Sequence, residues 1–310
     1  MAPRITTGPG AGSSETAALM RLATYASVSI ALLLIGAKSY AYLSTGAVSL
    51  LASLVDSVMD AAASLINLFA VRYALVPADR EHRFGHGKAE ALAALLQAGF
   101  IIASSAFLIH EAVYRLLEPQ PVEAVSVGVA VMVLAIVLTL ALLAIQRYVI
   151  RRTNSAAIKA DALHYRADLL SNTATIVALV LASFGLGNAD PLFALAIAGY
   201  LLFSTREILQ QALSDLLDRE LPDIQRRAII RLAESHAEVH GVHDVRTRMS
   251  GRTPIVQLHL ELNGEMPLRQ AHVIADEVEQ AIIGAFPDAD VVIHQDPAGL
   301  VEEQRFTHLE

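Results

Sequence analysis

Six apolar segments, each about as long as a bilayer is thick, constrain this 310-residue chain more than any other feature. A helix needs about 20 predominantly apolar residues to cross the hydrocarbon layer. Only 17% of the residues are charged, against about 25% in soluble domains. The segments are residues 19–43, 48–72, 89–113, 123–148, 160–184 and 190–212. We therefore predict an all-α domain of six membrane-spanning helices.

Basic residues gather in only some of the connecting loops. They are frequent after the second and fourth segments, whereas the loop after the third has Arg115 alone. The basic residues concerned are Arg72, Arg80, Arg83, Lys88, Arg147, Arg151, Arg152 and Lys159. Because Lys and Arg favour cytoplasmic loops, and six crossings return the chain to its starting side, we predict that both termini lie in the cytoplasm.

The chain changes character after Leu213. Residues 1–212 hold 14 basic and 13 acidic residues, whereas residues 213–310 hold nine basic residues, 18 acidic residues and seven of the 11 histidines. Helical spacing predicts helices at 222–240 and 267–284, and alternation predicts strands at 243–249, 254–262 and 289–295. This order, αββαβ, describes a small α+β domain. About 80 residues make a marginal core, so pairing with a second copy is expected.

The predicted organisation has four parts. Residues 1–16 are rich in Gly, Pro, Ser and Thr and are expected to form a disordered N-terminal tail. Residues 17–212 form the membrane domain and residues 213–296 the soluble domain, and residues 297–310 are a polar C-terminal tail. The chain has no Cys, so it has no disulfide, thiolate metal site or Cys nucleophile.

Ionisable residues interrupt two of the apolar segments. The stretch DSVMD places Asp56 and Asp60 four residues apart, and HYRAD places His164 and Asp168 four apart, so each pair shares a helix face. A charge at the bilayer centre costs about 2.5–3.5 kcal/mol, so these residues need a cation or protons as partners. The alternatives are that they cap helices, pair with Lys38 or join helices by hydrogen bonds.

Three carboxylates and one imidazole suit a borderline divalent cation. Deprotonated, the four groups carry a charge of −3, so metal and protons compete for the same lone pairs. That competition favours metal–proton exchange. His164 is the expected proton carrier, because an unperturbed imidazole has a pKa of about 6.5.

Two further groups of histidines and carboxylates lie outside the apolar segments. In the loop after the second segment, Asp79, His82 and His86 are spaced to meet around one metal, with glycines at 85 and 87 to turn the backbone. In the soluble domain the candidate ligands are His243, His259, His272, His294 and Asp296. These side chains suit one or two Zn²⁺-like ions. The alternative for both groups is that the histidines are incidental and solvated.

Together with the FGHGKAE stretch of residues 84–90, these features resemble the cation diffusion facilitator family, and most closely its bacterial ferrous-iron or zinc efflux branch. The resemblance covers residues 17–296. It implies a homodimer in the bacterial inner membrane with a metallochaperone-like cytoplasmic domain. It places a transport site at Asp56, Asp60, His164 and Asp168, and metal sites in the loop and the soluble domain at the residues above. It also implies a charge pair between subunits at Lys88 and Asp218.

The sequence therefore predicts export of a divalent metal by proton antiport, and no enzyme or nucleic-acid-binding protein. Zn²⁺ is favoured as the cargo and as the resident ion, because a four-ligand N/O site matches its tetrahedral geometry. Fe²⁺, Cd²⁺ and Mn²⁺ remain open as transported ions. The alternatives are a manganese-selective exporter of the same family and a membrane-anchored metal sensor or buffer that does not transport. An intramembrane metallohydrolase is disfavoured, since the sequence has no H-E-x-x-H motif.

Overall fold

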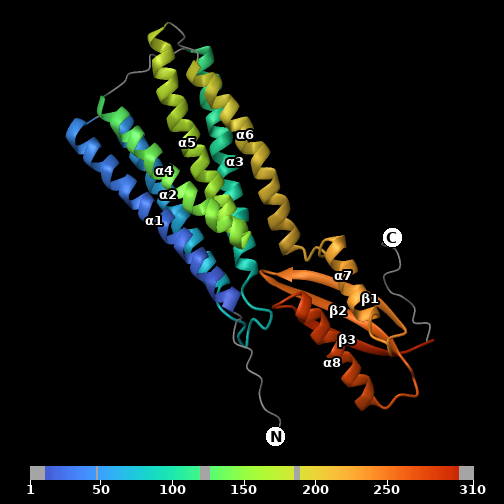
Figure 1. Cartoon of the computed structure of the whole chain (residues 1–310). Helices are drawn as coiled ribbons and strands as arrows, with labels where there is room; N and C mark the ends of the chain where they lie inside the picture. Colours follow the sequence, from blue (N-terminus) through green and yellow to red (C-terminus); the bar gives the residue numbers. More distant parts are fainter. Residues whose placement is uncertain (1–10, 47, 119–125, 185–188, 300–310) are drawn as a thin grey trace.

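The computed structural model describes residues 11–46, 48–118, 126–184 and 189–299. Six long helices come first and a small α+β unit follows (Figure 1). The helices of the first part are α1 (Ala11–Thr45), α2 (Val48–Ala74), α3 (Lys88–Leu117), α4 (Ser126–Thr153), α5 (Ala156–Ser183) and α6 (Ala189–Leu216).

Five of the six long helices are both long and apolar enough to cross a membrane: α1, α2, α3, α4 and α6. The remaining helix, α5, has 28 residues and is about 42 Å long, which also suffices to cross. It carries Lys159, Asp161, Arg166 and Asp168, which make it more polar than the others. The chain is a multi-pass membrane protein, as predicted.

The polar helix α5 lies at the centre of the bundle. It contacts each of the other five long helices, while α3 packs along α6, and α1 packs along α2 and α4 (Figure 1). This position explains how α5 tolerates charged residues, because neighbouring helices rather than lipid surround much of its surface.

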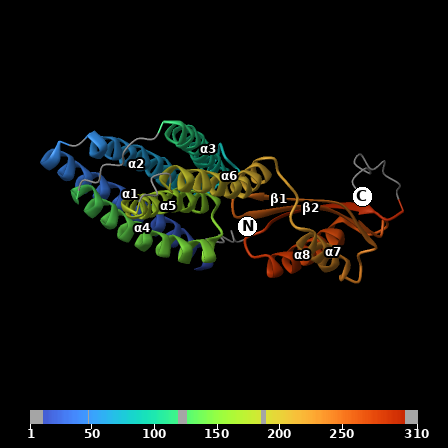
Figure 2. The same cartoon turned by 90° about the horizontal axis from the view of Figure 1, so that it is seen from above.

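The soluble domain consists of α7 (Asp223–Glu234), β1 (Gly241–Ser250), β2 (Thr253–Leu262), α8 (Leu268–Ala285) and β3 (Asp290–Pro297). β2 is the central strand, paired antiparallel with β1 and parallel with β3. Both helices cover the same face of the sheet (Figure 2). The predicted αββαβ order is confirmed, and so is the inward face of β2, where Val256, Leu258, Leu260 and Leu262 are buried.

Several predicted boundaries were wrong. Residues 11–16, expected in the N-terminal tail, belong to α1, so the first helix begins before its apolar part. Residues 235–240, expected in a helix, follow the end of α7, and Val239 packs against the soluble core from a turn. α6 extends past residue 212 to Leu216, and β3 reaches Pro297. The expected tails at 1–10 and 300–310 lie outside the described residues.

The two domains meet at an interdomain joint, formed by residues 84–88, Asp218 and the hairpin turn at 248–252 (Figure 1). Gly87 and Gly251 approach so closely that a Cβ on Gly251 would lie 2.4 Å from the Cα of Gly87. Ser250 donates a hydrogen bond to the carbonyl of Phe84 (2.9 Å). The joint therefore connects the α2–α3 loop to the tip of the β1–β2 hairpin.

An ion pair between Lys88 and Asp218 also holds the interdomain joint together. Lys88 Nζ donates to Asp218 Oδ1 at 2.8 Å, and Arg248 donates to the same oxygen at 3.2 Å. The hydrogen bond from the Lys88 ammonium, followed by that from Arg248, lowers the pKa of Asp218. The resemblance implied a pair between subunits at these residues. Here they pair within one chain.

Candidate metal centres

The membrane site lies between α2 and α5. Asp60, His164 and Asp168 each offer a ligand atom, and these atoms lie within 4.8 Å of one another. The Nε2–H of His164 donates to Oδ1 of Asp60 (3.0 Å), and the same nitrogen lies 3.9 Å from Oδ2 of Asp168. Because a carboxylate accepts this bond, a metal must displace the proton to bind the nitrogen. The group therefore combines metal ligands with an exchangeable proton.

Asp56, the fourth predicted ligand, is not part of this group. It lies one helical turn from Asp60 on α2 and its side chain is exposed. The hydrogen bonds that join α2 to α5 are made at Asp60 and at Ser64, whose hydroxyl is 2.8 Å from that of Tyr165. Asp56 lies one turn before these contacts along α2, where no hydrogen bond to α5 holds it among the described residues. The structure therefore brings together three of the four predicted residues.

Lys38 forms hydrogen bonds on α2 rather than an ion pair, although its charge still acts on Asp56 and Asp168. Its ammonium donates to the backbone carbonyl of Ser53 (3.1 Å) and to the Ser57 hydroxyl, both on α2. Among the described residues no ion pair joins it to Asp56 or Asp60. The third alternative, a hydrogen bond between helices, is seen at Asp60 and His164, and it is compatible with metal binding.

A polar network that the sequence reading gave no role lies one turn from His164. The fully buried Asp161 carboxylate accepts bonds from Ser27 of α1 (2.6 Å), Gln97 of α3 (3.2 Å) and Gln146 of α4 (2.8 Å). We call these four residues the Asp161 network. It fixes α5 against three helices at once. Its only signal in the sequence was an acidic residue near the start of an apolar segment, which is also typical of a helix terminus.

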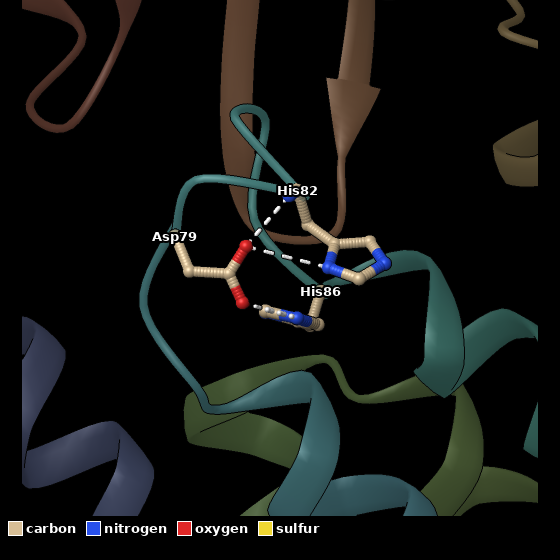
Figure 3. Close-up of side chains that lie close together, drawn as sticks. All are labelled: Asp79, His82 and His86. Carbon is tan, nitrogen blue, oxygen red and sulfur yellow. Dashed lines mark hydrogen bonds and ion pairs between the residues drawn. The ribbon is translucent and has the colours of Figure 1, made fainter.

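The loop site is assembled within eight residues between α2 and α3 (Figure 3). Asp79 Oδ1 lies 3.4 Å from His82 Nδ1, and Asp79 Oδ2 lies 3.4 Å from His86 Nε2. The two imidazole centroids are 4.5 Å apart. Gly85, with φ of 77°, lets the loop fold back on itself. The predicted group of three is thus brought together.

The loop ligands are oriented by their surroundings. Asp79 Oδ1 accepts from the backbone N–H of His82 (2.6 Å) and of Glu81 (2.9 Å), and these bonds, that of His82 first, lower the pKa of Asp79. His86 is buried, and its Nδ1–H donates to the carbonyl of Val76 (3.3 Å). Its Nε2 lone pair therefore points toward Asp79, which is the tautomer that a metal at this position requires.

The sheet cluster lies on the face of the sheet opposite the helices. His243, His259 and His294 occupy the same level on β1, β2 and β3. The buried Asp296 sits among them: its Oδ2 is 2.8 Å from His259 Nδ1 and 3.4 Å from His243 Nε2, and its Oδ1 is 3.0 Å from His294 Nε2. A cavity of about 320 Å³ opens beside His259 and His294. One carboxylate thus faces three imidazoles, which suits one or two divalent ions.

His272 lies apart from the sheet cluster. It is on α8, where its side chain is 68% exposed and its Nδ1 is 3.5 Å from Asp276. The residues of β2 that pack against α8 have even numbers, whereas His259 points to the other face. The expectation that His272 joins the other four ligands is therefore not met within one chain.

Comparison with known proteins agrees with both domains. A family model described as the cation efflux transmembrane domain matches residues 24–217, and one described as the cytoplasmic domain of cation efflux proteins matches residues 221–298. The chain belongs to the cation efflux family. This confirms the resemblance to the cation diffusion facilitators, and the second match identifies residues 221–298 as the family's cytoplasmic domain.

Two relatives in the cation efflux family are similar to this chain over nearly their whole length. The cation-efflux pump FieF of Pectobacterium carotovorum is 51% identical over 289 residues, covering 93% of this chain and 96% of that protein. FieF of Cronobacter sakazakii is 49% identical over 94% of this chain and 98% of that protein. The metal-bound C-terminal domain of the CzcD transporter from Thermotoga maritima is 29% identical, with a TM-score of 0.25, over 26% of this chain and 93% of that one.

Proposed function

We propose that this chain exports divalent metal cations from the bacterial cytoplasm across the inner membrane in exchange for protons. The observation that carries the proposal is the group of Asp60, His164 and Asp168 between two membrane helices. Two carboxylates and an imidazole inside a bilayer are costly unless they bind a cation or protons in turn. Family membership and the two FieF relatives support the same activity.

The transport site is proposed to comprise Asp56, Asp60, His164 and Asp168. Asp56 shares a face of α2 with Asp60, so a modest rotation or approach of α2 would bring its carboxylate to the metal. Zn²⁺ is the favoured cargo, because two to three carboxylates and one imidazole match its four-coordinate habit. Fe²⁺, Cd²⁺ and Mn²⁺ use the same ligand types and are tested alongside it.

The other two groups are proposed to hold regulatory metal. The loop site, Asp79, His82 and His86, adjoins the interdomain joint, and the sheet cluster lies in the cytoplasmic domain. We propose that the chain acts as a homodimer. Within one chain His272 lies on α8, on the side of the sheet opposite the sheet cluster. We therefore propose that the His272 of one subunit contributes to the sheet cluster of the other subunit. Both termini are proposed to be cytoplasmic, in line with the basic loops.

The test is metal uptake by the full chain in proteoliposomes under an imposed pH gradient, with Zn²⁺, Fe²⁺, Cd²⁺ and Mn²⁺ supplied in turn. Uptake that follows the gradient and is abolished by Asp60→Ala supports antiport and ranks the metals. The matched control is Asp223→Ala, an exposed carboxylate at the start of α7 in the soluble domain. Metal binding by the full chain without uptake of any metal would contradict antiport and favour the sensor or buffer.

A further inference from the structure

A cavity of about 560 Å³ lies between α4, α5 and α6, away from the three metal-binding groups. Its lining includes Lys159, near the start of α5, and Gln211, near the end of α6. Both of those helix ends adjoin the soluble domain. The cavity therefore lies in the half of the bundle next to that domain, and its volume is in the range of small-molecule sites, about 300–1,000 Å³.

The cavity has a cationic part and an apolar part. Three lining side chains are basic, Lys159, Arg166 and Arg206, and one is acidic, Glu207. Lys159 Nζ donates to Gln211 Oε1 (3.0 Å). Across the described ranges neither arginine takes part in an ion pair. Two unneutralised guanidinium groups beside an open cavity favour an anionic ligand, since Arg binds phosphate oxygens in pairs.

The apolar part faces outward from the bundle. Leu163 and Ile208 are buried in the floor, and Phe203 is 77% exposed at the edge. In a membrane helix an exposed Phe ring is solvated by acyl chains. A ligand that fills both parts must carry a phosphate at one end and hydrocarbon at the other.

The cavity is separate from the route of the metal. Lys159, Leu163 and Arg166 follow one stripe of α5, whereas His164 and Asp168 follow another, which faces α2. Three cations against one anion also repel a divalent cation. The positive charge is therefore not explained by metal transport.

We propose that this cavity, the lipid pocket, binds an anionic phospholipid, with its phosphate on Arg166 and Arg206 and its acyl chains against Leu163 and Phe203. Basic pockets between membrane helices on the cytoplasmic side are suited to anionic headgroups. A free phosphate ion would satisfy the arginines but would leave the apolar side of the pocket unfilled.

The first test uses the unmutated full chain, purified in detergent and exchanged into phosphatidylglycerol or phosphatidylcholine. Native mass spectrometry counts the lipids retained by each protomer, and thermal unfolding reports stabilisation. The expected result is one phosphatidylglycerol retained per protomer, with an affinity at least about tenfold above that of phosphatidylcholine. Equal retention of the two lipids, or equal stabilisation by inorganic phosphate, would overturn the proposal.

The second test compares two charge-matched double variants. Arg166→Gln with Arg206→Gln removes the two proposed phosphate ligands, and Arg147→Gln with Arg151→Gln removes two exposed arginines of α4 outside the pocket. The first variant should lose phosphatidylglycerol affinity by about tenfold or more, and the second should keep it. Equal losses would mean bulk attraction to the bilayer and would contradict a defined pocket.

Discussion

The membrane site and the sheet cluster use the same ligand types but hold them in different ways. In the soluble domain, three histidines stand on strands that backbone hydrogen bonds keep at a fixed spacing, about 4.8 Å. In the membrane, Asp60 and His164 stand on two helices that are joined locally by a few side-chain bonds. The ligand separation is fixed in the first case and adjustable in the second.

This difference matches the two kinds of metal binding that we propose. A resident ion is best held by ligands that cannot separate, whereas a transported ion must be released once per cycle. The Asp161 network holds α5 against α1, α3 and α4, but it includes no residue of α2. Movement of α2 relative to α5 would therefore open the membrane site without breaking that network.

The largest expected effect separates the two regions directly. Asp168→Asn keeps the side-chain shape and removes a charge from the membrane site, so the initial rate of Zn²⁺ uptake should fall more than about 100-fold. Metal binding by the sheet cluster should not change. Uptake in proteoliposomes and equilibrium titration of the same preparation measure the two quantities. Persistent uptake in this variant would show that the transport ligands are misassigned.

The converse change should affect the sheet cluster alone. Asp296→Asn removes the carboxylate that faces three imidazoles, so the metal affinity of the cluster should fall about 10–100-fold while uptake persists. Competition with a chelator measures the affinity. The matched control is Asp290→Asn, an exposed carboxylate at the start of β3. If Asp296→Asn abolished uptake, the two regions would not be separable as described.

A smaller effect tests whether the Asp161 network positions the membrane site. Asp161→Asn replaces one accepting oxygen by an amide N–H₂, which leaves at least one of the donors Ser27, Gln97 and Gln146 unmatched and should lower the free energy of unfolding by about 1–3 kcal/mol. The metal affinity of the membrane site should fall about tenfold, because His164 lies one turn away. Ser105→Ala removes a buried hydroxyl that makes no hydrogen bond within the described part of the chain; it is the control and should change neither quantity. An unchanged metal affinity in Asp161→Asn would mean that the network stabilises the fold but does not position the membrane site.

The smallest effect concerns the joint between the two regions. The pKa of Asp218 is lowered by Lys88, so the carboxylate stabilises docking at neutral pH, and this contribution is lost as the pH falls through that lowered value, below the ordinary 3.8. The pair is partly exposed, so Asp218→Asn should weaken docking by only about 0.5 kcal/mol. Hydrogen exchange of residues 84–88 and 248–252 measures docking.

In acid the wild type and Asp218→Asn should converge. Glu238→Gln, an exposed carboxylate outside the joint, should match the wild type at both pH values. A difference between the wild type and Asp218→Asn that persisted in acid would mean that the charge pair is not the cause.

Sequence periodicity predicted the fold well, because lipid around the membrane helices and water around the soluble domain each impose a strong pattern of apolar residues. Lipid-facing helices must be apolar along their whole length, and β2 must alternate to bury Val256, Leu258, Leu260 and Leu262. Helix ends were predicted less well, because the polar stretch AGSSET at 11–16 has no apolar pattern and nevertheless belongs to α1.

Site residues were predictable where spacing within one element decides contact. Asp79, His82 and His86 met as expected because they share a short loop. Asp56 and His272 did not join their groups, because spacing along a helix says nothing about where that helix meets its neighbour. The role of Asp161 was missed for the same reason: its partners lie on α1, α3 and α4.

The most direct test of metal–proton exchange is proton movement driven by metal alone. Zn²⁺ would be added outside proteoliposomes that contain a pH-sensitive dye and have no initial pH gradient. Antiport predicts that the lumen becomes alkaline as Zn²⁺ enters, and that Asp60→Ala abolishes both signals. Zn²⁺ entry with no change of lumenal pH, or the same alkalinisation with Asp60→Ala, would contradict exchange at this site.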